Sequence, residues 1–343
     1  MLINIIADMN IKCLLPFFQK GAYRSLTGAS IIISALNLSC EKSTRDTPST
    51  AQDSKSQSEA NLHVLRSHGP KLVNKLLATD SYDESVRLEP LKSKVSNLIS
   101  SYKSQNAVAS ASVFYMDLNT GAWFALNGSE GYTPGSLIKL PVCLSFFKSS
   151  ELKPGVMERM LFYDPKLHGV PIQTYEVEPI KPGKAYSMAE LIRRVLRDSD
   201  NYSTSLINEQ IDYDALKMLY EDLDQSVPDM HDISYTTNVI DYSRFLQVLY
   251  NGTWLSERNS ETALSYLAQS SFNEGLTKLL PVGTTVARKF GEYGKGEFKQ
   301  WHESGIVYSP KGHYLITVMT KGYDNEKLRL AIAEISKAVY EGR

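Results

Sequence analysis

The spacing of apolar residues changes along the chain, and each change marks an expected element of secondary structure. Residues 91–104 (LKSKVSNLISSYKS) carry apolar side chains at helical spacing, which predicts an amphipathic helix. Residues 109–128 (ASASVFYMDLNTGAWFALNG) contain two strand-like runs on either side of Asn119-Thr120-Gly121. Two such runs around a turn of this composition predict a β-hairpin.

Helical periodicity dominates the middle of the chain, from about residue 140 to about residue 275. Its clearest segments are 187–199, 203–211 and 239–252, and Ser187 and Glu190 form a capping box at the start of the first. Strand-like runs return after this block. They cover 284–294 and 301–322, with turns at 294–296 and 310–312, and a closing amphipathic helix is expected over 324–342.

The order of these elements is helix, two strands, helical block, about three strands, helix. It predicts an α+β fold in which both ends of the chain build one antiparallel sheet of about five strands. The terminal helices flank this sheet, and an all-helical subdomain is inserted at about 140–275. We expect one folded domain over 91–343, with its site in the crevice between the two parts.

The N-terminal 90 residues have a different character. Basic residues precede the apolar stretch 26–40 (LTGASIIISALNLSC), whose apolar core of about a dozen residues suits a signal peptide rather than a membrane span. The stretch resembles a bacterial lipoprotein signal over 1–39 that ends before a lipidated Cys40, although Asn37 departs from that pattern. A simple secretory signal and an uncleaved anchor are the alternatives. Residues 40–90 predict a disordered tether, with a short helix within 61–90.

Composition narrows the function classes. The 343 residues include 37 basic and 38 acidic side chains, a balance that gives no reason to expect nucleic acid as a partner. The 3 cysteines are far apart without metal-ligand spacing, so neither a metal site nor a cofactor is predicted. Cys143 lies in an apolar run and is expected to be a buried small hydrophobic residue.

The stretch 132–142 (YTPGSLIKLPV) is the first candidate for chemistry. Ser136 and Lys139 lie three residues apart at an expected helix start, so they share one helix face and lie near free backbone N–H groups. Burial would lower the pKa of Lys139, and a neutral lysine can accept a proton from a serine hydroxyl. The alternative is a serine N-cap followed by a solvated lysine.

Two further stretches are candidates for catalytic residues when they are considered together with 132–142. Ser199-Asp200-Asn201 separates two expected helices, and Lys289-Phe290-Gly291 lies on an expected strand. Taken alone, Ser199 and Asn201 are as easily turn and cap residues, and Lys289 could be solvated. We expect Asp200 to brace the turn and the neighbouring Arg288 to be exposed.

Ser-x-x-Lys, Ser-Asp-Asn and Lys-x-Gly in this order resemble the signature of class A β-lactamases and penicillin-binding proteins. The resemblance covers Leu91 to Arg343. It implies that Ser136 is the nucleophile, that Lys139 is or assists its base, and that Ser199 relays a proton to the leaving nitrogen. It further implies that Asn201 and Lys289 belong to the catalytic set and also bind substrate, together with Gly291. The backbone N–H groups of Ser136 and Glu292 would form the oxyanion hole.

The chain departs from this family at two places. Phe290 replaces the Thr or Ser of the third motif, which removes a hydroxyl that would bind a substrate carboxylate. No Glu-x-x-Leu-Asn segment occurs over 220–246, so the glutamate that activates the deacylating water is missing. The nearby carboxylates are Glu221, Asp222, Asp229 and Asp232, of which Asp229 and Asp232 are the candidates to replace it.

The resemblance therefore implies a serine hydrolase that forms an acyl-serine with β-lactam-type amides. Hydrolysis of this acyl-serine is expected to be slow. A penicillin-binding-type D-Ala-D-Ala peptidase, or another amide or ester hydrolase, is the alternative; a catalytically weak tethered binding module is the third. The expected substrate is a small β-lactam or a cell-wall peptide. We expect an exported monomer on the periplasmic or cell-surface side of a bacterial membrane, which it contacts only through a lipid anchor on Cys40.

Overall fold

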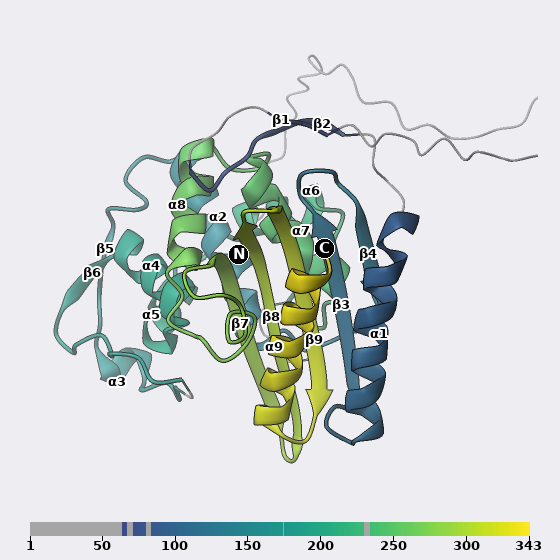
Figure 1. Ribbon diagram of the computed structural model, residues 1–343. Helices are drawn as coiled ribbons and strands as arrows, with labels where there is room; N and C mark the ends of the chain where they lie inside the picture. Colours follow the sequence, from purple (N-terminus) through teal and green to yellow (C-terminus); the bar gives the residue numbers. More distant parts are fainter. Residues whose placement is uncertain (1–63, 67–70, 80–83, 174, 230–233) are drawn as a thin grey trace, which may run out of the picture. The chain divides into compact units, whose positions relative to one another are not determined.

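The structure is a computed structural model that describes residues 64–66, 71–79, 84–173, 175–229 and 234–343 (Figure 1). The expected signal peptide, Cys40 and the tether up to residue 63 lie outside these residues. Within the described part of the chain, no helix is both long enough and apolar enough to cross a membrane.

One antiparallel sheet of five strands organises the fold, in the order β4-β3-β9-β8-β7. Its strands are β3 (Ser110–Asp117), β4 (Trp123–Leu126), β7 (Thr285–Lys295), β8 (Phe298–Ser309) and β9 (Gly312–Gly322). The expected hairpin is the β3–β4 pair. Strand β9 pairs with the whole length of β3, from Ser110 opposite Lys321 to Asp117 opposite Tyr314. The two ends of the chain therefore share one sheet, and the predicted fold class is confirmed.

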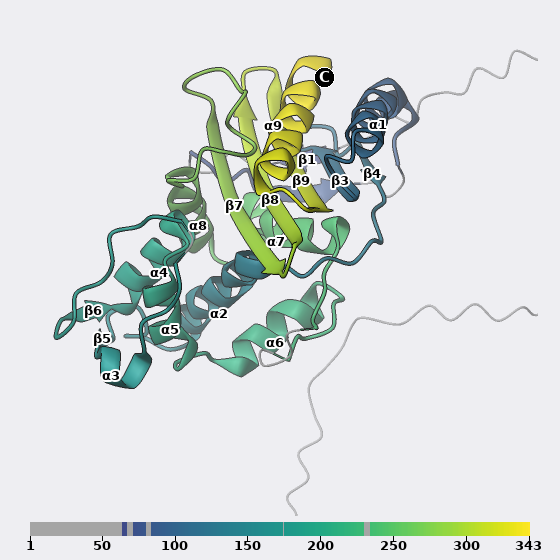
Figure 2. The ribbon, with the colours of Figure 1, turned by 90° about the horizontal axis from the view of Figure 1, so that it is seen from below.

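Helices cover both faces of the sheet (Figure 2), and each face carries its own hydrophobic core. On one face, α1 (Glu89–Ser104) and α9 (Asn325–Gly342) contact each other and bury side chains such as Val95 and Ile332. On the other face, α7 (Val239–Asn251) and α8 (Glu257–Ala268) pack against the sheet. Neighbouring residues on β7 alternate between the cores, with Val286 in the first and Ala287 in the second.

The remaining helices lie in the chain between β4 and β7, in the region where the helical subdomain was expected. They are α2 (Lys139–Leu152), α3 (Pro165–His168), α4 (Met188–Asp198), α5 (Asn201–Asn208) and α6 (Tyr213–Asp222), with the short strands β5 (Met160–Phe162) and β6 (Ala185–Ser187). Helix α2 is buried along most of its length, including Cys143 at 0% exposure as expected. The Ser187 side chain caps α4 by accepting from the Glu190 N–H.

The expected helix within 61–90 is wrong. The described residues there form β1 (Val64–Arg66), β2 (Leu76–Thr79) and a 3-10 turn, η1 (Val86–Leu88), and α1 begins only at Glu89. Leu72 and Val73 between the strands are buried, and both of their N–H groups donate to Glu261 Oε2. Because these partners lie far away in the sequence, local helical spacing could not reveal them. This part of the expected tether belongs to the folded unit.

Candidate active site

Strand β7 approaches the 3-10 helix η2 (Gly135–Ile138) unusually closely. A Cβ on Gly135, whose φ is +52°, would overlap the Glu292 carbonyl group. A Cβ on Gly291 would overlap the Pro134 carbonyl oxygen in turn. Glycine at both positions therefore allows the backbone of Glu292 to lie beside the start of η2, where Ser136 follows Gly135.

Lys139 is the first residue of α2 and is 6% exposed. Its ammonium group donates to the Ser199 carbonyl at 2.7 Å, to Ser199 Oγ at 3.2 Å and to Asn201 Oδ1. These are its hydrogen bonds among the described residues. None of them is with Ser136 Oγ, although the implied role of Lys139 as the base for Ser136 calls for such a bond. The structure thus brings the first two motifs together through Lys139, while the Ser136 side chain is half-buried beside them.

Burial has the largest effect on the Lys139 amine. It lowers the pKa of this group to about 8, against an opposing contribution from the negative charge of Asp200. Roughly a tenth of the Lys139 side chains are therefore neutral at pH 7. A neutral amine at this position is able to accept a proton.

The Ser199-Asp200-Asn201 turn is held in an uncommon conformation. Ser199 ends α4 with φ +56° and ψ +32°, in the left-handed region. Asp200, completely buried, caps α5 by accepting from the Tyr202 N–H at 2.9 Å, and pairs with Arg194 Nε at 2.8 Å. Asp200 thus braces the turn, as the sequence predicted, and presents Ser199 to the two lysines.

Lys289 reaches the same hydroxyl from β7. It is 1% exposed, and its ammonium group donates to Ser199 Oγ at 2.8 Å and to the Phe290 carbonyl at 3.0 Å. Burial and the nearby charge of Lys139 lower its pKa well below the usual lysine value. With both lysines donating to Ser199 Oγ, its own proton is left to donate to a third group.

Arg288 is buried, and the expectation that it would be exposed is wrong. At 5% exposure it lies 3.3 Å from Glu303 Oε1 through its Nε and donates to the carbonyls of Ser270 and Phe272. Glu303 itself, which the sequence analysis missed, is fully buried on β8, and burial raises its pKa to about 7. No local signal marked Glu303, because β8 also carries other polar residues, such as Gln300 and His302. This pair braces the loop that leads into β7.

The segment before α4 contains three residues that the sequence did not indicate, because they belong to no motif. They are Ile172, Gln173 and Tyr175. Asn201 donates through Nδ2 to the Ile172 carbonyl at 2.6 Å, and its N–H donates to Gln173 Oε1 at 2.8 Å. Tyr175 then donates to the Ser271 carbonyl at 2.7 Å. This segment therefore connects the second motif to the loop before β7, and it occupies the amide of Asn201 with a carbonyl of the chain itself.

The four carboxylates near the expected position of the missing glutamate differ in placement, and only Asp229 and Asp232 were candidates to replace it. Asp222 accepts from Trp254 Nε1 at 2.9 Å, and Glu221 lies 3.7 Å from Lys217 on the same helix. Asp229 is described but its role stays a prediction, and Asp232 lies outside the described residues. In the described part of the chain, no carboxylate oxygen hydrogen-bonds to Lys139.

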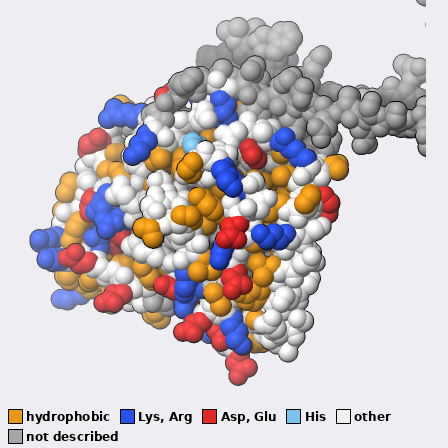
Figure 3. All heavy atoms as spheres, in the orientation of Figure 1, with side chains coloured by type: hydrophobic (Ala, Val, Ile, Leu, Met, Phe, Trp, Pro, Cys, Tyr) orange, Lys and Arg blue, Asp and Glu red, His pale blue; other side chains and the backbone are white. Residues whose placement is uncertain are grey.

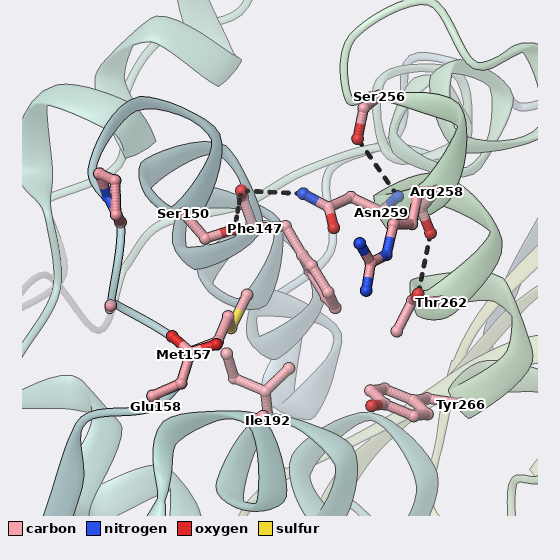
Figure 4. A pocket seen from close by; sticks show the side chains of 13 residues that line it. Phe147, Ser150, Met157, Glu158, Ile192, Ser256, Arg258, Asn259, Thr262 and Tyr266 are labelled. Carbon is pink, nitrogen blue, oxygen red and sulfur yellow. Dashed lines mark hydrogen bonds between the residues drawn. The ribbon is translucent and has the colours of Figure 1, made fainter.

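A separate cavity of about 510 Å³ opens between the end of α2, the start of α4 and α8 (Figure 4). The cavity is lined by apolar side chains, such as Met157 and Ile192, and by the charged residues Glu158 and Arg258. The two charged residues lie on different sides of the cavity. None of the candidate catalytic residues is among the described residues that line it. The cavity is therefore distinct from the site around Ser199.

Solved structures with the same architecture define the class of fold as β-lactamase-like. A mutant of PBP-A, solved as an acyl-enzyme complex with penicillin-G, is 23% identical, with a TM-score of 0.63 over 74% of this chain and 96% of that chain. A β-lactamase from Chitinophaga pinensis DSM 2588 is 18% identical, with a TM-score of 0.64 over 74% and 99%. The TLA-3 extended-spectrum β-lactamase is 19% identical, with a TM-score of 0.64 over 73% and 98%. At these identities the likeness establishes the fold.

The sequence comparison identifies the family. Residues 90–342 match the Beta-lactamase enzyme family, and the chain belongs to it. It is a hydrolase of the β-lactamase-like serine type. Among curated protein sequences, none matches this chain.

Proposed function

We propose that this hydrolase forms an acyl-serine intermediate at Ser136 with β-lactam-type amides. The observation that carries the proposal is the Ser199 hydroxyl, which accepts from both Lys139 and Lys289 and keeps its proton for a leaving group. Two buried lysines around one serine cost stability and have no purpose in a passive binding module. They fit a site that moves protons.

The acylation step follows from these groups. The neutral Lys139 amine takes the Ser136 hydroxyl proton while Oγ attacks the substrate carbonyl carbon and forms the new C–O bond. The negative oxygen that results is held by the backbone N–H groups of Ser136 and Glu292, and such a donor is worth roughly 10²–10³ in rate. The C–N bond then breaks, the leaving nitrogen takes the proton of Ser199, and Lys139 returns a proton to Ser199.

We propose that hydrolysis of the acyl-serine is slow relative to its formation. Deacylation needs a water deprotonated at a fixed position, and losing a positioned base typically costs about 10²–10⁴-fold. The absence of a carboxylate among the described hydrogen bonds of Lys139 supports this proposal. The same observation favours a second candidate function, a penicillin-binding-type peptidase that cleaves cell-wall peptides and is trapped by β-lactams.

Intact-protein mass spectrometry after addition of benzylpenicillin tests both candidates. We expect a covalent adduct of one equivalent that forms quickly and decays slowly, and Ser136→Ala should not form it. The control is Ser100→Ala, an exposed serine on α1 that should leave labelling unchanged. Labelling of the Ser136→Ala variant at the wild-type rate would refute the assignment. Decay as fast as formation would refute slow deacylation.

We also propose the setting in which the enzyme acts. An exported monomer, anchored by lipid on Cys40 and facing the periplasm or the cell surface, would meet β-lactams or cell-wall peptides there. On the face shown in Figure 3, acidic and basic side chains are interspersed.

A further inference from the structure

The part of the site next to Lys289 contains buried polar groups. Ser199 is the residue that would protonate the leaving group, so the groups around Ser199 and Lys289 border the leaving-group side of a substrate. Ser199 and Lys289 are 3% and 1% exposed, and their polar atoms bond to each other. A substrate anion would have to reach this buried ammonium past the side chains that cover it.

An aromatic ring stands beside this ammonium. Lys289 Nζ lies 4.5 Å from the centre of the Phe290 ring, whose electron-rich face attracts a cation and repels a carboxylate. The ring is stacked on Phe272 at 4.3 Å, and Tyr175 meets it edge-on at 5.6 Å. Phe290 is thus fixed in an aromatic cluster and presents no hydroxyl at this part of the site.

The neighbouring arginine cannot replace the missing donor. Arg288 is committed to Glu303 and to the backbone carbonyls of Ser270 and Phe272. Breaking this buried pair to bind a substrate anion would leave the Glu303 carboxylate without its partner, which is strongly unfavourable. Arg288 is therefore not free to bind a carboxylate. Lys289 gives two of its three protons to Ser199 Oγ and the Phe290 carbonyl, and its ammonium group lies beside the Phe290 ring.

We propose that this enzyme prefers acyl donors whose leaving-group side carries a neutral, apolar group in place of a free carboxylate. The substrate class is then neutral amides, esters and β-lactam esters. The inference rests on the proposed acyl-serine function and names the substrate class of that same site. Phe290 is its specificity-determining residue, with Tyr175 and Phe272 as positioning residues.

Benzylpenicillin and its methyl ester provide a matched pair, because they differ only in the carboxylate. The second-order rate constant for acylation of the full chain is measured for each by intact-protein mass spectrometry. We expect the ester to react about tenfold faster or more, because the carboxylate of the acid loses hydration beside the Phe290 ring without gaining a charge-assisted hydrogen bond in return. An acid that reacts as fast as the ester, or faster, overturns the inference. Failure of both to acylate Ser136 overturns the proposed function, and the inference with it.

Substitutions of Phe290 test whether the ring is the cause. Phe290→Thr supplies a hydroxyl and opens space, so the ratio of rates should shift toward the acid by about tenfold or more. Phe290→Leu, which stays apolar and adds no hydroxyl, should keep the preference for the ester. An unchanged ratio in a folded Phe290→Thr variant overturns the role of Phe290. If the Phe290→Thr variant does not fold, the test rests on the ratio of ester to acid rate constants in the wild type and in Phe290→Leu. Loss of the preference for the ester in Phe290→Leu contradicts the inference.

Discussion

Lys139 and Lys289 donate to the same atom, Ser199 Oγ, at 3.2 and 2.8 Å. The first belongs to a helix and the second to a strand. Burial lowers the pKa of both groups, and the nearby charge of Lys139 lowers the pKa of Lys289 further. The pair therefore holds a neutral amine ready at a pH where an exposed lysine would be charged.

Lys139→Arg should slow acylation by about 10²–10⁴-fold, because a guanidinium stays charged and cannot accept the Ser136 proton. Labelling by benzylpenicillin, followed over time, measures this rate. Lys217→Arg, on the exposed part of α6, is the matched control and should react like the wild type. A Lys139→Arg enzyme with the full rate would show that another group is the base.

The acylation rate should rise with pH and level off above about pH 8. The reactive form is the neutral amine, whose fraction grows about tenfold per pH unit below the Lys139 pKa of about 8. The rate constant at low substrate concentration between pH 6 and pH 9.5 measures this. A rate that is flat across this range, or that falls as pH rises, would contradict a lysine base.

Gly135→Ala should destabilise the protein by more than its backbone angle explains. Gly155 has a comparable positive φ of +84° but no atom within 4 Å of an added Cβ, so Gly155→Ala isolates the angle penalty of about 1 kcal/mol. The added methyl on Gly135 must also push η2 away from β7, at a total cost of about 2 kcal/mol or more. Urea unfolding compares the two variants, and equal losses of stability would show that the close approach is not tight.

Gln173→Ala should speed acylation by severalfold. Gln173 accepts from the Asn201 N–H and helps to hold the Ile172 carbonyl on the Asn201 amide, which a substrate carbonyl must displace. Glu176→Ala, an exposed change in the same segment, serves as the control. The rate constant for the methyl ester of benzylpenicillin is the measurement, and a slower reaction in Gln173→Ala would show that this segment supports binding instead.

Cys40→Ser should move the protein from the membrane fraction to the soluble fraction, because a single serine cannot carry the lipid. Fractionation of cells followed by immunoblotting measures this. A wild-type protein that is already soluble, with an N-terminus beyond residue 40, would contradict the anchor.

Local patterns in the sequence were enough for most of the fold. The hairpin around Asn119-Thr120-Gly121 and the capping box at Ser187 were predictable because their contacts lie within a few residues. The three motifs, in order, indicated the residues that Lys139 and Lys289 bring together at Ser199. Asp200 as the brace of its turn was predictable for the same local reason.

Only the tertiary structure decided what depends on partners far away in the chain. The burial of Leu72 and Val73 depends on Glu261, and the burial of Arg288 depends on Glu303 and on the loop that covers it. The Ile172 carbonyl on Asn201 comes from a segment without periodicity or motif. Burial free energy and pairing of charges act between residues that the fold brings together, and a local pattern carries no information about them.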